Sequence, residues 1–283
     1  MADHITITHF TDPICPFAFS AEPLMRRLEW QLGANATWRI RLVGLAATVE
    51  ELEERGLSVA MLDTHYVRFA RDYGMPIDQT PRVRLVASVP VSTAIAAGGF
   101  TSPEHLALMV RAARVRHFAG ELLDEPSTIR GVAVDAGLDP DEIERQAASR
   151  LAKDTMSDDM DAARSPSPEA LAQPGRLAPW AGGLRYTCPS LEMTRRSDGR
   201  RIAAPGFQAR EAYELAVANL IPGTPLRPAP ESAREVLEWA PFPLATVEVA
   251  AVRDVDVDTV REELVEFARF TPVGQDGYWQ ITS

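Results

Sequence analysis

The sequence predicts an α/β fold in which a long helical segment interrupts a small mixed sheet. Three observations support this prediction. Residues 4–43 read as strand, helix and strand, residues 48–164 contain no convincing strand, and residues 190–220 read as two strands and a helix. Apolar residues alternate in the predicted strands and recur every three to four positions in the predicted helices. The chain has 283 residues, of which 46% are hydrophobic, so it can bury a sizeable core.

The first forty residues predict a βαβ unit. Residues 4–10 alternate in the strand period, and the pair Asp12-Pro13 ends this strand. A helix is expected over residues 17–32, with a kink near Pro23 because proline interrupts the helical ladder. Residues 37–43 alternate again. Because a helical crossover joins the two strands, we expect them to be parallel.

The middle of the chain predicts a helical insert. Ser102 and Asp139 each precede a proline and an acidic first turn, which is typical of a capped helix start. The turn-rich stretch over residues 165–175 predicts a loop. Helices are expected over residues 62–73, 84–97, 103–123, 127–136 and 140–153.

The segment after the insert predicts a hairpin followed by a helix. Strands are expected over residues 190–194 and 201–204, and a turn at Asp198-Gly199 joins them. A helix is expected over residues 209–220, and Pro222-Gly223 ends it. The predicted order is therefore βαβ, helical insert, ββα.

A proline-rich stretch after Ile221 predicts a linker to a small C-terminal α+β module, residues 231–283. Three helices and a final hairpin are expected there, a pattern that resembles a winged helix. The helices are expected over residues 233–239, 244–252 and 258–267, and the hairpin strands over 269–271 and 278–281. The module holds eleven acidic residues and four arginines, and its third helix is acidic. We therefore expect a structural or protein-contact role for it, not DNA binding.

The charge of the chain restricts its partners. The net charge is −11 at pH 7, so the protein repels phosphate backbones and anionic lipid. We expect neither nucleic acid nor a membrane as a partner, and a homodimer is left open. The first residues show no leader pattern, and no stretch is apolar enough to span a bilayer, so the expected location is the cytoplasm.

Chemistry is expected at one of the two cysteines, Cys15 and Cys188. Two cysteines are too few for a disulfide framework or for the usual four ligands of zinc, and no metal is expected. Cys15 lies at the predicted strand-to-helix turn, where free N–H groups and the helix dipole stabilise a thiolate. Because Pro16 suits the first helical turn, we expect the sulfur of Cys15 to be exposed at the helix tip. A buried, inert cysteine is the alternative.

Two stretches together resemble the DsbA family of thiol oxidoreductases, notably its FrnE-like branch. The first is Asp12 to Leu24, which contains Cys15-Pro16-Phe17-Ala18 and resembles the active-site turn. The second is Tyr186-Thr187-Cys188-Pro189-Ser190, which resembles the cis-proline loop. The resemblance extends over residues 4–222. It implies a thioredoxin-like domain of residues 1–47 and 171–222, with residues 48–170 as the large helical insert.

The chain departs from the family at Ala18, which takes the place of the resolving cysteine and gives CxxA instead of CxxC. The intramolecular step that ends a mixed disulfide cannot occur there without that thiol. Three outcomes stay open: a monothiol reaction completed by a small thiol, a Cys15–Cys188 couple, or the loss of redox function. The resemblance places Cys188 opposite Cys15, but Cys188 can also be a small apolar replacement for Thr or Val.

The resemblance implies a DsbA-like thiol-disulfide oxidoreductase with Cys15 as its single nucleophile. Cys188 is the second candidate catalytic residue, and the expected substrate contacts are Pro16, Phe17, Ala18, Thr187 and Pro189. We expect no tightly bound cofactor. Glutathione or mycothiol is the expected co-substrate, and a small thiol or a protein thiol is the expected partner. Two alternatives remain: a thiol-dependent isomerase or transferase of the 2-hydroxychromene-2-carboxylate isomerase or kappa type, and a non-catalytic adaptor that binds a protein.

Overall fold

The computed structural model describes residues 4–282, and a four-stranded mixed sheet forms its centre. The strands lie in the order β2-β1-β5-β6. Strand β1 pairs in parallel with β2 and in antiparallel with β5, which also pairs with β6. The strands are β1 (Ile5–Thr11), β2 (Ala36–Leu42), β5 (Ser190–Arg195) and β6 (Arg201–Ala204). The predicted βαβ unit and hairpin thus form one sheet.

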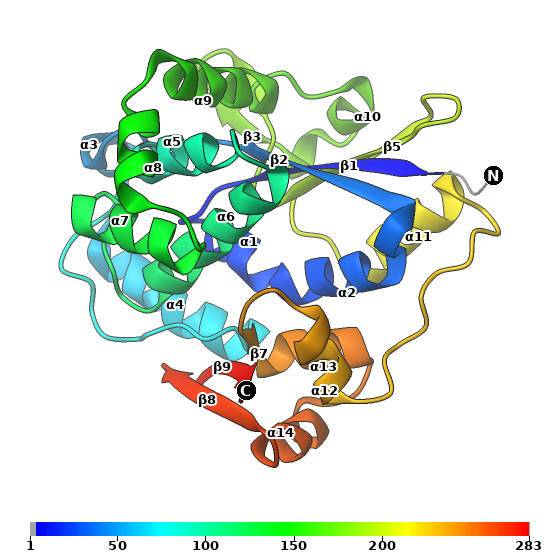
Figure 1. The fold of residues 1–283 in the computed structure, drawn as a ribbon. Coiled ribbons are helices and arrows are strands. Elements are labelled where there is room, and N and C mark those ends of the chain that lie inside the picture. Colours follow the sequence, from blue (N-terminus) through cyan, green and yellow to red (C-terminus); the bar gives the residue numbers. More distant parts are fainter. Residues whose placement is uncertain (1–3, 283) are drawn as a thin grey trace.

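Helices cover both sides of this sheet (Figure 1). On one side, α2 (Glu22–Leu32) and α11 (Arg210–Leu220) pack over Ile5 and Ile7, whose side chains are fully buried. On the other side, α9 (Arg150–Ala163) runs along β2, and its Asp159 pairs with Arg41 at 2.6 Å. The alternation of β1 therefore supplies apolar contacts to both layers.

The predicted helical insert is present. Residues 48–170, all within the described part of the chain, contain helices and no strand, and most of their apolar side chains form a core of their own. Figure 1 shows this insert from blue through cyan to yellow-green, with α9 above the sheet and α4 below it, near α1. Besides α9, its helices are α3 (Val49–Glu54), α4 (Val59–Tyr73), α5 (Val89–Gly98), α6 (Pro103–Phe118), α7 (Pro126–Asp135), α8 (Pro140–Ala147) and α10 (Pro168–Leu171).

Two predicted helices of the insert have the wrong bounds. The helix expected from residue 84 begins only at Val89, because the backbone before it bonds to other loops. The N–H groups of Ser88 and Val89 both donate to the carbonyl of Ala46 at 3.0 Å. The helix expected to reach residue 123 ends at Phe118, because Gly120 adopts a φ of 109° that a continuing helix does not allow.

Two serine caps account for two further differences in the insert. The helix expected over residues 140–153 is two helices, because the side chain of Ser149 accepts a hydrogen bond from the backbone of Ala152 and starts α9. The stretch expected to be a loop over residues 165–175 contains α10, which Ser167 caps in the same way, and a short 3-10 turn, η2 (Pro174–Arg176).

A hairpin and a 3-10 turn in the described chain were not predicted. Strands β3 (Ala178–Trp180) and β4 (Gly183–Arg185) form a small separate sheet before the second cysteine. A 3-10 turn, η1 (Gly33–Asn35), leads from α2 into β2. These elements are too short to carry a periodic pattern.

The C-terminal module contains three helices and a three-stranded sheet in the order β7-β9-β8, drawn in orange and red in Figure 1. The helix expected from residue 244 begins two residues later, because Leu244 and Ala245 pair with β9. The elements are α12 (Ala233–Trp239), β7 (Leu244–Ala245), α13 (Thr246–Arg253), α14 (Val257–Val265), β8 (Ala268–Val273) and β9 (Asp276–Ile281).

The module packs closely on the rest of the protein. Trp30 of α2 is 1% exposed and lies in the apolar core of the module. At the tip of the β8–β9 turn, Gly274 has a φ of 58°, and a Cβ there would lie 2.0 Å from the carbonyl oxygen of Ile77. Only glycine fits this approach. Helix α2 is therefore covered by the sheet on one side and by the module on the other.

Candidate active site

The first predicted site residue, Cys15, lies between the end of β1 and α1 (Pro16–Ser20). The buried carboxyl of Asp12 organises this turn: it accepts hydrogen bonds from the N–H of Ile14 at 3.1 Å and of Leu45 at 2.9 Å, and from the Ser88 hydroxyl at 2.9 Å. Cys15 is the N-cap residue and Pro16 begins the helix. Helix α1 ends at Ser20, and Ala21 separates it from α2 beside the predicted kink at Pro23.

The structure brings Cys15 and Cys188 together. Both are free thiols, and the sulfur of Cys15 donates to the carbonyl oxygen of Cys188 at 3.3 Å. The peptide bond between Cys188 and Pro189 is cis. Cys15 follows the end of β1 and Cys188 precedes the start of β5. The antiparallel pairing of these strands, with Phe10 opposite Ser190, brings the two cysteines to the same end of the sheet.

The expectation of an exposed sulfur at the helix tip was wrong. Cys15 and Cys188 are each 7% exposed and share an apolar cluster with Phe10, Val43 and Tyr186. The cis-proline loop covers the helix tip, which the local sequence around Cys15 does not indicate.

The environment shifts the pKa values of the two thiols in opposite directions. A hydrogen bond with the thiol of Cys188 lowers the pKa of Cys15 below its ordinary value of 9.0, and the backbone N–H groups of Ala18 and Phe17 lower it further. Burial and the charge of Asp12 raise this pKa but do not outweigh the hydrogen bonds. Burial raises the pKa of Cys188, and the adjacent Cys15 raises it further. Cys15 is therefore the more acidic thiol of the pair, and Cys188 keeps its proton to higher pH.

We expect iodoacetamide to alkylate Cys15 faster than Cys188, with a pH midpoint for Cys15 below 9.0. Only the thiolate reacts, so the lowered pKa keeps Cys15 reactive at a pH where an ordinary cysteine is already protonated. Peptide mass spectrometry over a pH series measures both rates in one sample. Cys188→Ser is the control that removes the second thiol. A midpoint at or above 9.0, or faster labelling of Cys188, would contradict the expectation.

The other predicted contact residues surround the thiols in different ways. Phe17 is 45% exposed and packs edge-on against Phe69, with ring centroids 4.6 Å apart, so it presents an aromatic surface next to the site. The side chain of Ala18 is fully buried, and this residue acts only through its backbone N–H. Pro16 is partly exposed, whereas Pro189 is buried. Thr187 donates its hydroxyl hydrogen to the carbonyl of Arg176 at 2.9 Å, which holds the loop.

A cavity of about 310 Å³ lies beside Cys15, between the active-site turn and the insert. Ile14 and Pro16, the two neighbours of Cys15 in the chain, both line it. Its polar lining comes from Tyr66, His117, Arg55 and Arg185. The remaining lining is apolar: Leu45, Leu52, Leu57, Leu62, Leu85 and Val86. Its place beside the turn makes this cavity the candidate binding space for a small molecule that reacts at Cys15.

The polar lining of this cavity was missed by sequence reasoning. Tyr66 and His117, both on the insert, lie in contact: the Tyr66 hydroxyl oxygen is 2.8 Å from Nε2 of His117. Burial and the charge of Arg82 lower the pKa of His117 to about 3, so its ring is neutral. No local motif marks these two residues. The sequence could have pointed to Arg185, because it lies three positions before Cys188 in the chain.

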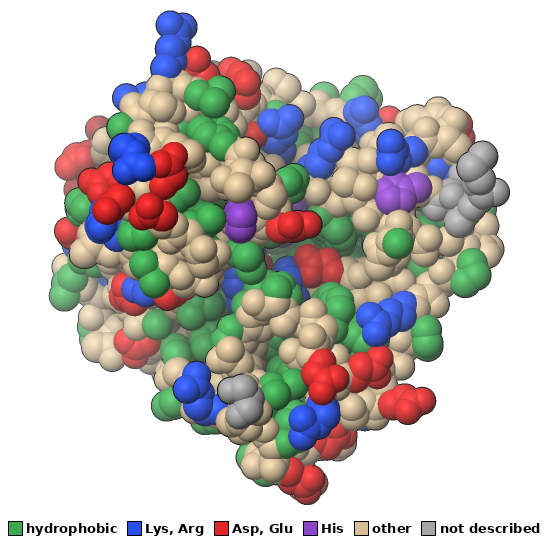
Figure 2. Space-filling model, in the orientation of Figure 1, with side chains coloured by type: hydrophobic (Ala, Val, Ile, Leu, Met, Phe, Trp, Pro, Cys, Tyr) green, Lys and Arg blue, Asp and Glu red, His purple; other side chains and the backbone are tan. Residues whose placement is uncertain are grey.

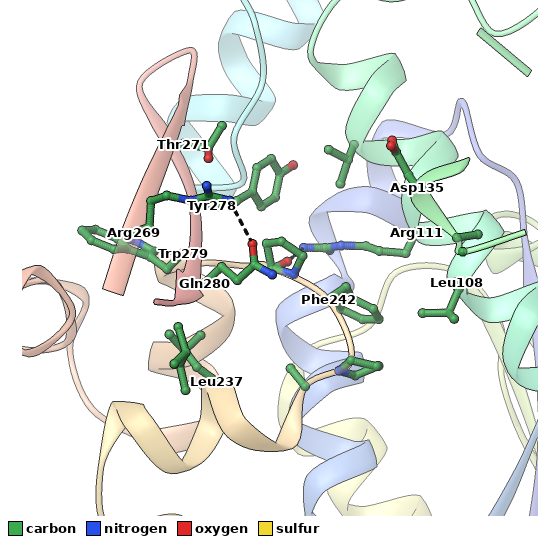
Figure 3. Close-up of a pocket in the computed structure, with 18 of the residues that line it drawn as sticks. Leu108, Arg111, Asp135, Leu237, Phe242, Arg269, Thr271, Tyr278, Trp279 and Gln280 are labelled. Carbon is green, nitrogen blue, oxygen red and sulfur yellow. Dashed lines mark hydrogen bonds between the residues drawn. The ribbon is translucent and has the colours of Figure 1, made fainter. Parts of the chain in front are cut away.

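A second, larger cavity of about 780 Å³ lies between α6, α7 and the C-terminal module (Figure 3). Figure 2 shows this face of the molecule hollowed between the insert and the module. Arg111 extends into the region from α6 beside Phe242, with its guanidinium 4.9 Å from the ring centre. Arg269 donates to Gln280 across the module hairpin at 3.3 Å. None of the predicted site residues lines this cavity, so it is separate from the thiol chemistry.

Among residues 4–282, no group of three or more His, Cys, Asp or Glu side chains is arranged to hold a metal ion. In the same part of the chain, no helix has the length and the apolar composition that crossing a membrane requires.

Solved structures with the same fold agree with this architecture. A candidate protein disulfide isomerase from Nitrosomonas europaea superposes with a TM-score of 0.58 at 16% identity, covering 76% of this chain and 97% of that one. The cytosolic disulfide reductase DsbM from Pseudomonas aeruginosa gives 0.51 at 17% identity, with 76% and 99% covered. A probable DsbA oxidoreductase from Streptomyces coelicolor gives 0.53 at 16% identity, with 77% and 90% covered. At these identities the likeness shows the fold alone.

The sequence itself assigns the family. No curated protein matches this chain at a significant level. The family model for the DSBA-like thioredoxin domain matches residues 6–167, which is more than half of the chain and includes Cys15 and most of the insert. This match, with the sheet order and the paired cysteine loops, agrees with the resemblance at the active-site turn. The chain belongs to the family of DSBA-like thioredoxin domains.

Proposed function

We propose that this protein catalyses thiol-disulfide exchange through Cys15 as a single nucleophile, with a small thiol as co-substrate. The observation that carries the proposal is the position of Cys15. It is the N-cap residue of α1, its sulfur contacts Cys188, and a cavity of about 310 Å³ lies beside it. Family membership supports the reaction class, and Ala18 at the usual position of the second thiol supports the single-cysteine route.

The first step of the proposed reaction forms a mixed disulfide. The Cys15 thiolate attacks one sulfur of a small disulfide RSSR, so that a Cys15–SR bond forms and the RS–SR bond breaks. The departing RS⁻ takes the electron pair and a proton from solvent. The N–H groups of Phe17 and Ala18 lower the pKa of Cys15 and so maintain the attacking thiolate. In this step the substrate disulfide is reduced and Cys15 is oxidised.

A second small thiol completes the proposed cycle. Its thiolate attacks the SR sulfur of the mixed disulfide, releases a new small disulfide, and returns Cys15 to the thiolate form. Cys188 is close, but burial and the neighbouring Cys15 raise its pKa, so it stays protonated at neutral pH and attacks slowly. We therefore assign Cys188 to hydrogen bonding with Cys15. The proposal includes a cytoplasmic setting, where reduced small thiols are abundant.

We expect purified protein incubated with glutathione disulfide to gain one glutathione, at Cys15. Intact mass spectrometry measures the adduct, and oxidised mycothiol provides a parallel probe. Cys15→Ser should abolish the adduct, because the serine hydroxyl does not form a disulfide. Cys188→Ser should keep it. A spectroscopic check that both variants are folded completes the comparison.

The other outcomes contradict this proposal in distinct ways. An internal disulfide between Cys15 and Cys188, with no stable adduct, would replace the small thiol with Cys188 as the resolving group. No reaction at either cysteine would exclude the exchange reaction. In that case, binding of reduced glutathione to both wild type and Cys15→Ser would favour the isomerase or transferase alternative, and the lack of such binding would favour the adaptor.

A further inference from the structure

Arginine side chains gather on one side of the cavity beside Cys15. Arg185 and Arg55 line the cavity directly. Arg164, at the end of α9, lies close enough that the positive charges of Arg185 and Arg55 lower its pKa, after burial as the largest cause. The three side chains come from three distant parts of the sequence, so no local helix pattern produces the cluster.

Two of these arginines have no acidic partner in an ion pair within the described residues. Arg185 donates only to the backbone carbonyl of Tyr186, at 2.8 Å. Arg164 donates to the carbonyls of Met160 at 2.9 Å and Val43 at 3.4 Å, and stacks over Trp180. Nearby acids compensate only in part: Glu51 pairs with Arg55 at 3.3 Å, and Asp161 lies one turn before Arg164 on the same helix.

This arrangement is unusual in a chain with a net charge of −11, where most buried or half-buried arginines form ion pairs. Elsewhere Arg84, for example, binds both Asp124 and Glu125. The positive charges of Arg164 and Arg185 act on each other without an acidic partner for either in the described chain, which opposes folding because like charges repel. Guanidinium groups match carboxylates with two parallel hydrogen bonds, so an anionic ligand would relieve the repulsion.

We infer that the thiol or disulfide that reacts at Cys15 carries a carboxylate, which Arg185 binds at the wall of the adjacent cavity, with Arg164 adding positive charge nearby. The inference rests on the proposed function and names its substrate class. Arg185 is also close enough to the thiol pair for its charge to act on Cys188. A substrate that extends from Cys15 into the cavity therefore meets Arg185.

Two small disulfides that differ in charge test this inference. The anionic probe is 3,3′-dithiodipropionate, and the neutral probe is bis(2-hydroxyethyl) disulfide. The rate of mixed-disulfide formation at Cys15 is measured for each by intact mass spectrometry. We expect wild type to prefer the anionic probe, and Arg164→Gln/Arg185→Gln to lose this preference by about tenfold, the scale of a charge-assisted hydrogen bond. The preference of wild type should also fall with added salt.

The controls separate charge at the site from charge elsewhere. Arg39→Gln/Arg201→Gln removes two exposed arginines that do not line the cavity and should leave the preference unchanged. If the double variant folds poorly, the same preference is measured for Arg185→Gln alone. If wild type reacts equally with both probes, or the site variants keep the preference, the inference is overturned while the exchange reaction stands. If Cys15 reacts with neither probe, the proposed function fails, and the inference with it.

Discussion

Glu248→Ala should lower the free energy of unfolding by about 3 kcal/mol. The carboxylate of Glu248 is fully buried in α13 and accepts hydrogen bonds from both Nη atoms of Arg111, at 2.8 and 2.6 Å. It also accepts from the backbone N–H of Ala245 at 2.8 Å. The variant leaves the buried Arg111 guanidinium with a carboxylate oxygen of Glu22 at 3.4 Å and the carbonyl oxygen of Pro243 at 3.0 Å. A buried charge that has lost its main carboxylate partner is the costly result.

The same network supports the active-site turn. Glu22, at the start of α2, accepts hydrogen bonds from Arg111 and Arg114, and Arg114 also bonds the hydroxyl of Thr11 at the end of β1. Although burial opposes it, the guanidinium groups of Arg114, Arg26 and Arg111 lower the pKa of Glu22 to about 2. The module, the insert and the strand that leads to Cys15 are thus connected through buried ions.

Urea unfolding of the variants measures this stability. Glu144→Gln is the matched control, because it removes a carboxylate that pairs with Arg130 on the surface, and it should change stability by less than about 1 kcal/mol. Arg111→Met combined with Glu248→Met should cost less than the sum of the single changes, since both charges are then removed. A loss for Glu248→Ala no larger than that for Glu144→Gln would show that the buried pair is not coupled to folding.

The fold could be predicted from sequence where periodicity or a cap marks an element. The alternation before Asp12 and the match at the active-site turn placed β1, α1 and the thiol at their junction. Boundaries failed where distant groups decide them: Val89 starts α5 because of the carbonyl of Ala46, and Leu244 joins a strand because β9 is adjacent. Such hydrogen bonds leave no local pattern.

The candidate site was predictable only in its cysteines. The resemblance of two loops placed Cys188 beside Cys15, and the structure has them in contact. The burial of Cys15 was not predicted, because it depends on the loop that covers the turn. The cavity wall was not predicted either, since Tyr66, His117 and Arg185 come from three segments that meet only in the folded protein.

Ala18→Cys should convert the site to an intramolecular dithiol. Residue 18 follows Cys15 by one helical turn at the start of α1, where members of the family usually have the second thiol. In the variant, the new thiolate attacks the sulfur of Cys15 in the glutathione adduct, forms an internal disulfide and releases glutathione as its thiolate. Because the attacking group is held in place, the adduct should disappear at least about a hundredfold faster than in wild type at the same concentration of added thiol.

Time-resolved intact mass spectrometry after mixing with glutathione disulfide follows this conversion. Ala18→Ser is the matched control, because it adds a group of similar size without a thiol and should keep the adduct. Ala18→Cys/Cys188→Ser identifies the partner: if the internal disulfide still forms, it joins position 18 and not position 188 to Cys15. The side chain of residue 18 is fully buried, so a larger group there costs about 1 kcal/mol or more in packing. A folded Ala18→Cys variant whose adduct persists as long as that of wild type would show that the helix tip no longer has the geometry of a dithiol site.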